Sequence, residues 1–466
     1  MQYARLHTVA GLSARAIGGE IVCRQARKQM WPGSEASLAA SCIAMFYFHK
    51  LPEHLETKMK LRRVLGITVL SASLLTACGG GDNLSSSGVP HVVADIAIPG
   101  VGPGVNFSFD LGDISGGRFF FTDRNNAAVD VIDIASQKLV AQIKGSGTLA
   151  FAGAGARPAL SGPDGINAVG NLLYVGDVNS LKIADPATNT IVKNITVSTG
   201  GVRADEGCLD PVHGMYMISS PEEATPFATF IDTQTQTILA KVTFSDAGGA
   251  PSAGLEQCRY DAASDTFFVN NDGSTANPHG ELIKVPAASI RAIPHGATVN
   301  YTALAGAAAY PLGNCDPTGL ALGPGTDAAV GCREGTAGAP LLVQILNRSS
   351  GALVASLNAG GGDEIQYDTK SNRYYNASYR WTATGNSVGP AGCSAAAPCT
   401  PVLTIIDAAT RAVVARVATG NNTHSVAVDP VSGLIFMPYS AADTPAGCAT
   451  CAANRFTNGG VLAFQM

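Results

Sequence analysis

Gly117-Arg-Phe-Phe-Phe-Thr-Asp-Arg124, followed by Ala128-Val-Asp-Val-Ile-Asp-Ile-Ala135 and Lys138-Leu-Val-Ala-Gln-Ile-Lys144, is the stretch that decides the fold of this chain. Each segment is rich in β-branched or aromatic residues, and polar turn residues separate the segments. This pattern predicts short antiparallel strands joined by tight turns. The module recurs seven times from about residue 105 onward, and no stretch after residue 90 has a helical period with caps. The sequence therefore predicts an all-β repeat protein.

The spacing of the modules predicts how the strands are arranged. Each module reads as four strands, and the first strands begin near residues 106, 162, 204, 254, 314, 362 and 423. Such repeats are typical of the blades of a β-propeller. The seventh module lacks a fourth strand, whereas residues 91–98 supply a spare strand ahead of the first module. We therefore expect a seven-bladed propeller over residues 90–466, closed by this N-terminal strand. Six or eight blades are the alternatives, because the fourth module is irregular between residues 285 and 302.

The second strands carry a family signature. Phe120-Phe-Thr-Asp123, Tyr174-Val-Gly-Asp177 and Phe268-Val-Asn-Asn271 resemble the Tyr-Val-Thr-Asn hallmark of YVTN-type propellers. The likeness covers about residues 90–466 and is strongest in modules one, two and six; modules four, five and seven carry long insertions. The resemblance implies a propeller and an exported life, and it implies little about activity because the fold hosts binding proteins and several kinds of enzyme.

The N-terminal region predicts export. A basic segment at residues 59–63 precedes an apolar run at 64–75, which is too short for a membrane anchor and predicts a signal peptide over residues 59–77. The closing Leu75-Thr-Ala-Cys78 resembles a bacterial lipobox. This resemblance implies cleavage before Cys78, acylation of its thiol, and a flexible tether over residues 78–89. It favours the outer membrane, where the source has one, because no Asp follows the cysteine directly. An ordinary signal peptide cut nearby is the alternative.

Residues 1–58 are then awkward, since they would place a signal peptide in mid-chain. The simplest interpretation is a start site assigned too early, with Met59 as the initiator. A genuine N-terminal extension is the alternative.

Charge and cysteine content fit an exported binding protein. Residues 78–466 carry 20 Lys and Arg against 31 Asp and Glu, and no basic run, which argues against nucleic acid and against an electrostatic membrane surface. Membrane contact is expected through the lipid alone, and the protein is expected to be a monomer. An even number of cysteines in an exported chain predicts disulfides. The candidate pairs are Cys393–Cys399 and Cys448–Cys451, each within one loop, Cys315–Cys332 within one module, and Cys208–Cys258 between equivalent positions of adjacent modules, although the sequence does not determine the connectivity. A redox-active role for the Cys448–Cys451 pair is the less favoured alternative.

Acidic residues recur where the first strands begin. First strands line the central channel of a propeller, so these residues should form one ring at one mouth: Asp110, Asp164, Asp205, Glu206, Glu256, Asp316, Asp363, Glu364 and His424. Converging carboxylates repel one another unless a cation, a proton or water lies among them. One divalent cation, Ca²⁺ or Mg²⁺ before Zn²⁺ or Mn²⁺, is the functional interpretation. A water-filled channel whose acids serve the strand entries is the structural alternative.

Other candidate residues lie beside this ring. Arg203 and Arg259 could clamp a carboxylate ligand or neutralise the acids. An aromatic patch formed by Tyr374, Tyr375, Tyr379, Arg380 and Trp381 could stack a ligand, although core packing explains its first two residues better.

Three functions follow from these features. The leading expectation is an envelope lipoprotein that binds a small ligand or a protein partner at the channel mouth. The second is a metal-dependent hydrolase or lyase of the lactonase kind, although the Asn that such propellers place around calcium is missing here. The third is a structural scaffold in an envelope assembly.

Overall fold

The computed structural model describes residues 13–17, 20–24, 89–333, 335–442 and 447–466. The chain divides into two compact units, residues 1–83 and 84–466. In the first unit, β1 (Ser13–Ile17) and β2 (Glu20–Arg24) pair as an antiparallel hairpin. The predicted signal peptide, Cys78 and nearly all of the predicted tether lie outside the described residues. No helix in the described part of the chain is long and apolar enough to cross a membrane.

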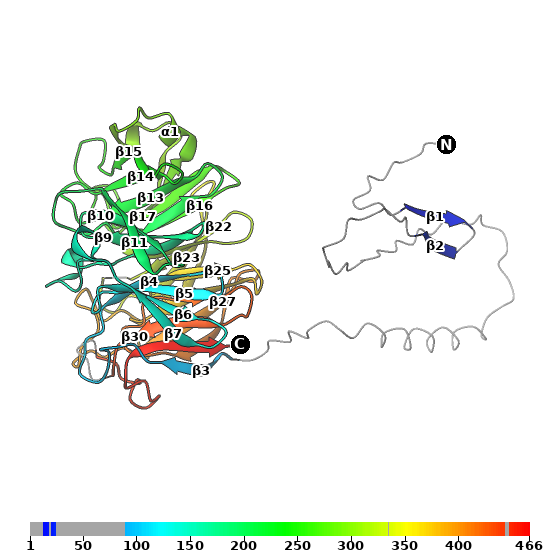
Figure 1. Cartoon of the computed structure of the whole chain (residues 1–466), viewed down its shortest axis with the longest axis vertical. Helices are drawn as coiled ribbons and strands as arrows, with labels where there is room; N and C mark the ends of the chain where they lie inside the picture. Colours follow the sequence, from blue (N-terminus) through cyan, green and yellow to red (C-terminus); the bar gives the residue numbers. More distant parts are fainter. Residues whose placement is uncertain (1–12, 18–19, 25–88, 334, 443–446) are drawn as a thin grey trace. The chain divides into compact units, whose positions relative to one another are not determined.

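The second unit is the predicted seven-bladed β-propeller (Figure 1). Over its described residues it consists of seven sheets, each built on four antiparallel strands. These strands follow one another in sequence except in blade 4, which carries an insertion before its last strand, and in the last blade. Blades 1 and 2 comprise β4 (Phe109–Ser115), β5 (Arg118–Asp123), β6 (Ala128–Asp133) and β7 (Lys138–Ile143), then β8 (Ile166–Val169), β9 (Leu172–Asp177), β10 (Ser180–Asp185) and β11 (Thr190–Thr196). Blades 3 and 4 comprise β12 (Gly207–Asp210), β13 (Met215–Ser220), β14 (Phe227–Asp232) and β15 (Thr237–Thr243), then β16 (Leu255–Asp261), β17 (Thr266–Asn271), β18 (Glu281–Pro286) and β20 (Ala308–Pro311).

The remaining three blades repeat the pattern. Blades 5 and 6 comprise β21 (Pro317–Leu322), β22 (Asp327–Cys332), β23 (Leu342–Asn347) and β24 (Leu353–Asn358), then β25 (Ile365–Asp368), β26 (Arg373–Ser378), β27 (Val402–Asp407) and β28 (Ala412–Ala418). Blade 7 comprises β29 (Ala427–Val428), β30 (Ile435–Tyr439), β31 (Gly460–Gln465) and β3 (His91–Ile96).

The irregular fourth module is an insertion between the last two strands of blade 4. It holds α1 (Ala287–Arg291), β19 (Thr298–Asn300) and the 3-10 turn η3 (Tyr301–Ala303). Strand β19 pairs in parallel with β15 and so adds a fifth strand to blade 3. The insertion therefore decorates the blade edge and leaves the blade count at seven. Two further 3-10 turns, η1 (Gly147–Leu149) and η2 (Pro158–Leu160), lie between blades 1 and 2.

The ring closes as predicted, through the N-terminal strand. β3 pairs antiparallel with β31, with Ile96 opposite Val461 (Figure 1). The Tyr439 hydroxyl of the same blade donates to Asp95 at 2.8 Å. This pairing covers an edge that would otherwise expose a row of backbone donors and acceptors.

Turn chemistry explains why the hairpins recur so regularly. Asp232 ends β14, and its Oδ1 accepts hydrogen bonds from the amides of Gln234 and Thr235 at 2.8 and 2.7 Å. Gln236 then takes a left-handed conformation, with φ +55°, before β15 begins. An Asx turn, in which an Asp side chain accepts from backbone amides, followed by one residue in the left-handed conformation reverses the chain tightly. Asp407 opens the equivalent turn of blade 6, which Arg411 closes with φ +51°.

The core lies between the blades. Seven apolar clusters among the described residues each join two neighbouring sheets around the ring. Between blades 7 and 1, for example, the Phe119 and Phe436 rings stack with centroids 5.2 Å apart. Burying one such side chain contributes about 1.5–3 kcal/mol. Each sheet is therefore stabilised mainly by its two neighbours.

The four predicted disulfides are all present. Cys208–Cys258 joins the innermost strands of blades 3 and 4, and Cys315–Cys332 lies within blade 5. Cys393–Cys399 and Cys448–Cys451 each close a short loop on blades 6 and 7.

Candidate functional site

The channel mouth at which the innermost strands begin is a cavity of about 370 Å³. Six of the nine predicted ring residues line this mouth cavity: Asp110, Asp205, Glu206, Glu256, Asp363 and His424. They converge because equivalent positions at the starts of successive innermost strands face the same axis. Asp164 lies directly behind this lining and is fully buried.

Arginines neutralise one side of the mouth. Arg124 follows β5 directly, and its guanidinium lies between two acids of neighbouring blades. Its Nη2 is 3.0 Å from Asp110 Oδ2, its Nε donates to Asp164 Oδ1 at 3.0 Å, and Nη2 also contacts Asp164. The Nη1 group donates to the Phe109 carbonyl at 2.9 Å. Three blade-1 and blade-2 groups are thus joined by one buried cation.

Arg203 extends this network. Its Nη2 lies 2.7 Å from Asp205 Oδ2, its Nη1 lies 3.6 Å from Asp164, and its Nε donates to Glu222 at 2.9 Å. Burial raises the pKa of Asp164 and the two guanidinium groups offset part of that rise, which leaves the pKa at about 7. The neighbouring carboxylates raise the pKa of Arg203 above its ordinary value against the effect of its own burial. Arg203 therefore neutralises the acids of the mouth, which is one of its two expected roles; the other was to bind a carboxylate ligand.

The other side of the mouth keeps its charges unpaired. Among the described residues, no ion pair within 4.0 Å involves Glu206, Glu256 or Asp363. Glu206 is 6% exposed, and its Oε2 has no hydrogen-bond partner. Burial and the surrounding carboxylates raise its pKa well above the ordinary value.

Glu256 has one cation nearby. Burial and the charge of Asp272 raise the pKa of Glu256 well above its ordinary value. Arg333 lowers this pKa, although its guanidinium lies more than 4.0 Å from the Glu256 carboxylate. Three carboxylates and one guanidinium therefore face this part of the cavity without an ion pair to another described residue.

His424 is held by the protein rather than offered to a ligand. Its ring stacks on Phe109 with centroids 4.3 Å apart and planes 7° from parallel. Its Nδ1 lies 2.8 Å from the Asn422 carbonyl, and its Nε2 is 3.9 Å from Asp110. The histidine thus forms part of the wall on the neutralised side.

Two predicted ring residues lie elsewhere. Asp316 takes a left-handed conformation, with φ +48°, and its carboxylate accepts from the Gly335 amide at 2.6 Å, so it serves a turn outside the mouth lining. Glu364 lines a second cavity, whereas the preceding Asp363 lines the mouth; both residues lie just ahead of β25. Arg259 also lines the second cavity rather than the mouth.

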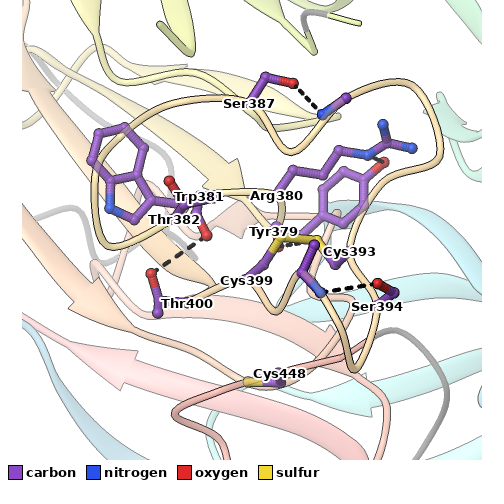
Figure 2. Close-up of a disulfide and its surroundings, with 12 residues drawn as sticks. Tyr379, Arg380, Trp381, Thr382, Ser387, Cys393, Ser394, Cys399, Thr400 and Cys448 are labelled. Atoms are coloured by element: carbon purple, nitrogen blue, oxygen red, sulfur yellow. Dashed lines mark hydrogen bonds between the residues drawn. A yellow bond between two sulfur atoms is a disulfide. The ribbon is translucent and has the colours of Figure 1, made fainter. Parts of the chain in front are cut away.

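The insertion of blade 6 builds part of the rim (Figure 2). The Arg380 Nε donates to the Tyr379 hydroxyl at 2.9 Å, and both residues line the mouth cavity beside the Cys393–Cys399 loop. Trp381 points away from them, and the Arg416 guanidinium lies 4.4 Å from the centre of its indole ring. Tyr374 and Tyr375 are core residues with 0% and 1% exposure. The aromatic patch is therefore divided among rim, outer surface and core.

Sequence reasoning missed Arg124 and Arg333. Both follow directly after the second strand of their blade, and Asp272 occupies the same position in blade 4. Aligning the modules at the ends of their second strands, in addition to the starts of their first strands, would have found this second ring of charges.

The expected metal was tested against the carboxylate geometry. Asp110, Asp164 and Asp205 have ligand atoms within 4.8 Å of one another. Arg124 and Arg203 already form ion pairs with all three, so these residues do not fit a divalent cation. A second such group, Asp210, His213 and Asp265, is likewise bound to Arg291. Glu206, Glu256 and Asp363 do not form a cluster this compact among the described residues.

Comparisons with known proteins support the fold alone. No family model and no curated protein matches the chain. Among solved structures, it is similar to a chain of hydrazine synthase from Kuenenia stuttgartiensis, with 14% identity and a TM-score of 0.53 over 75% of this chain and 97% of that chain. It is also similar to a chain of a mitotic checkpoint complex, with 12% identity and a TM-score of 0.50 over 88% of this chain and 99% of that chain. One such fold hosts many unrelated functions, so these similarities do not specify what this chain does.

Proposed function

We propose that this protein is an envelope-anchored lipoprotein whose mouth cavity binds a small organic cation. The unpaired carboxylates Glu206, Glu256 and Asp363 carry the proposal, since they face a cavity of about 370 Å³ opposite acids that arginines already neutralise. The lipobox-like sequence at Cys78 and the four disulfides support an exported life.

The spacing of the carboxylates favours an organic ammonium over a metal ion. A divalent metal needs several oxygen ligands at 2.0–2.6 Å, which only a compact cluster supplies. Carboxylates spread around a cavity suit a larger cation that donates several hydrogen bonds, and charge-assisted bonds of this kind contribute about 1.5–3 kcal/mol each. Arg333 and Arg380 in the same wall would receive an anionic group of a zwitterionic ligand.

The metal-dependent hydrolase or lyase is the second candidate. It requires a metal held by free carboxylates. The one compact buried acid cluster of the described residues already forms ion pairs with arginines. The third candidate, a scaffold that binds protein partners through its long loops, does not need the mouth charges at all.

Calorimetric titration of the protein, purified without chelator, with 1,4-diaminobutane, choline and CaCl₂ separates these candidates. We expect an amine to bind, and the combined Glu256→Gln and Asp363→Asn variant to weaken binding by about tenfold or more. Asp185→Asn, which removes the same kind of charge at an exposed turn, should leave binding unchanged. Binding of Ca²⁺ alone, lost in the same variant, would favour the metal-dependent candidate. No binding of any cation would refute the mouth as a cation site.

A further inference from the structure

A second cavity lies further along the same innermost strands. Its volume is about 490 Å³, and residues of β4, β8, β12, β16, β21 and β25 line it. It shares Glu206 with the mouth cavity but otherwise has its own walls. The two cavities differ in the kind of hydrogen-bonding group that has no protein partner: carboxylate acceptors at the mouth, and donors in the second cavity.

Two of the three acids that line the second cavity, Asp113 and Glu364, are occupied by the protein, and the third, Glu206, is the one shared with the mouth cavity. The Asp113 carboxylate accepts from the amides of Ile114 and Ala168 at 2.7 and 2.8 Å. Glu364 accepts from the Ser425 hydroxyl and the Val426 amide at 2.8 and 2.9 Å. Both residues connect neighbouring blades in this way. Their carboxylate oxygens therefore already accept hydrogen bonds from the protein and have a structural role.

The donors, in contrast, are in surplus. Gln257 is 1% exposed; its Oε1 accepts from the Leu320 amide at 2.6 Å, and its Nε2 has no partner. The Arg259 guanidinium makes one hydrogen bond, to the Cys258 carbonyl at 2.9 Å, and no ion pair within 4.0 Å among the described residues. Asn167 uses its Oδ1 to accept from Tyr216. An unmatched buried donor costs about 1–3 kcal/mol, which a ligand acceptor would recover.

We propose that the second cavity binds a small monocarboxylate through Arg259, with the amide groups of Gln257 and Asn167 as further donors. Arginine binds a planar carboxylate with two parallel hydrogen bonds. The nearby Asp113, Glu206 and Glu364 would repel a doubly charged anion more than a singly charged one. Leu111, Leu322, Tyr260 and Tyr367 add apolar wall, so an acid with a hydrocarbon body suits the space.

Calorimetric titration with benzoate, butyrate and inorganic phosphate tests this proposal. We expect one equivalent of benzoate or butyrate to bind, and Arg259→Gln to weaken that binding by at least about tenfold. Arg259→Lys should give an intermediate loss, because it keeps the charge and loses the fork of donors. Arg157→Gln, at an exposed position in the loop before blade 2, is the matched control and should bind like the wild type.

The mouth and the second cavity are tested independently. The combined Glu256→Gln and Asp363→Asn variant should retain carboxylate binding, so a failure of the mouth proposal does not affect this one. Circular dichroism and the melting temperature establish that Arg259→Gln is folded; if it is not, Arg259→Lys carries the comparison. Undetectable carboxylate binding by the wild type, full binding by both Arg259 variants, or a preference for phosphate would each overturn the proposal.

Discussion

Replacing Arg124 by Leu should destabilise the propeller strongly. The substitution keeps an aliphatic side chain at this position and removes the guanidinium that lies between Asp110 and Asp164. Asp164 is 0% exposed, and its remaining cation, Arg203, is 3.6 Å away. Removing one partner of such a buried pair leaves an uncompensated charge, which costs about 3–5 kcal/mol in free energy of unfolding.

The cost should also depend on pH. Loss of Arg124 raises the pKa of Asp164 further above its value of about 7. The folded variant then binds a proton that the unfolded chain, with an ordinary Asp pKa near 4, has lost. The stability of the variant therefore falls as pH rises above about 4 and continues to fall until the raised folded pKa is passed, by up to about 1.4 kcal/mol per pH unit. The difference from the wild type should be larger at pH 8 than at pH 6.

Urea denaturation at pH 6 and pH 8 measures both effects. Adding Asp164→Asn to Arg124→Leu should recover much of the loss, since the buried charge is then gone. Arg291→Leu removes a more exposed arginine, which pairs with the partly exposed Asp265 and lies 3.7 Å from the buried Asp210, and it should cost less than Arg124→Leu. The reasoning is refuted if Arg124→Leu costs no more than Arg291→Leu at pH 8.

Three further predictions concern other parts of the ring. Burial raises the folded pKa of Glu364 to about 7, so stability should fall as pH rises from 5 to 7, and Glu364→Gln should flatten this slope in urea titrations; an unchanged slope would contradict the burial argument. Replacing Cys208 and Cys258 by Ala opens a 50-residue loop and should cost up to about 4 kcal/mol in free energy of unfolding, whereas replacing Cys448 and Cys451 should cost less, and equal losses would count against the loop-length reasoning. Deleting residues up to Ile96 uncovers the edge of β31, so the protein should self-associate in sedimentation velocity runs, and a stable monomer would show that the edge is protected by other means.

The blades could be predicted from sequence because their determinants are local. Alternating strands and Asx turns repeat within each module, and the disulfide pairs follow from equivalent positions in adjacent modules or from short loops. The convergence of Asp110, Asp205 and Glu256 at one mouth follows from the same alignment.

What sequence could not supply is the pairing across blades. Arg124 and Asp164 come from different modules, and nothing in either module shows that the guanidinium reaches the next blade. The doubled acids were also beyond reach, because which of Asp363 and Glu364 faces the mouth depends on where the strand register begins. Asp316 departs from the ring because its left-handed conformation, invisible in the sequence, turns the chain ahead of β21.

The pairing of β3 with β31 has a consequence for how the protein is made. The two strands of that hydrogen-bonded pair lie at opposite ends of the propeller sequence, so during synthesis β3 emerges first and must wait for nearly the whole domain. Until then β3 has no partner strand, and blades 1 and 6, which pack against blade 7, each lack one packing face. The order of emergence thus places ring closure at the end of synthesis, so a nascent chain that stalls before β31 cannot close the ring by this pairing.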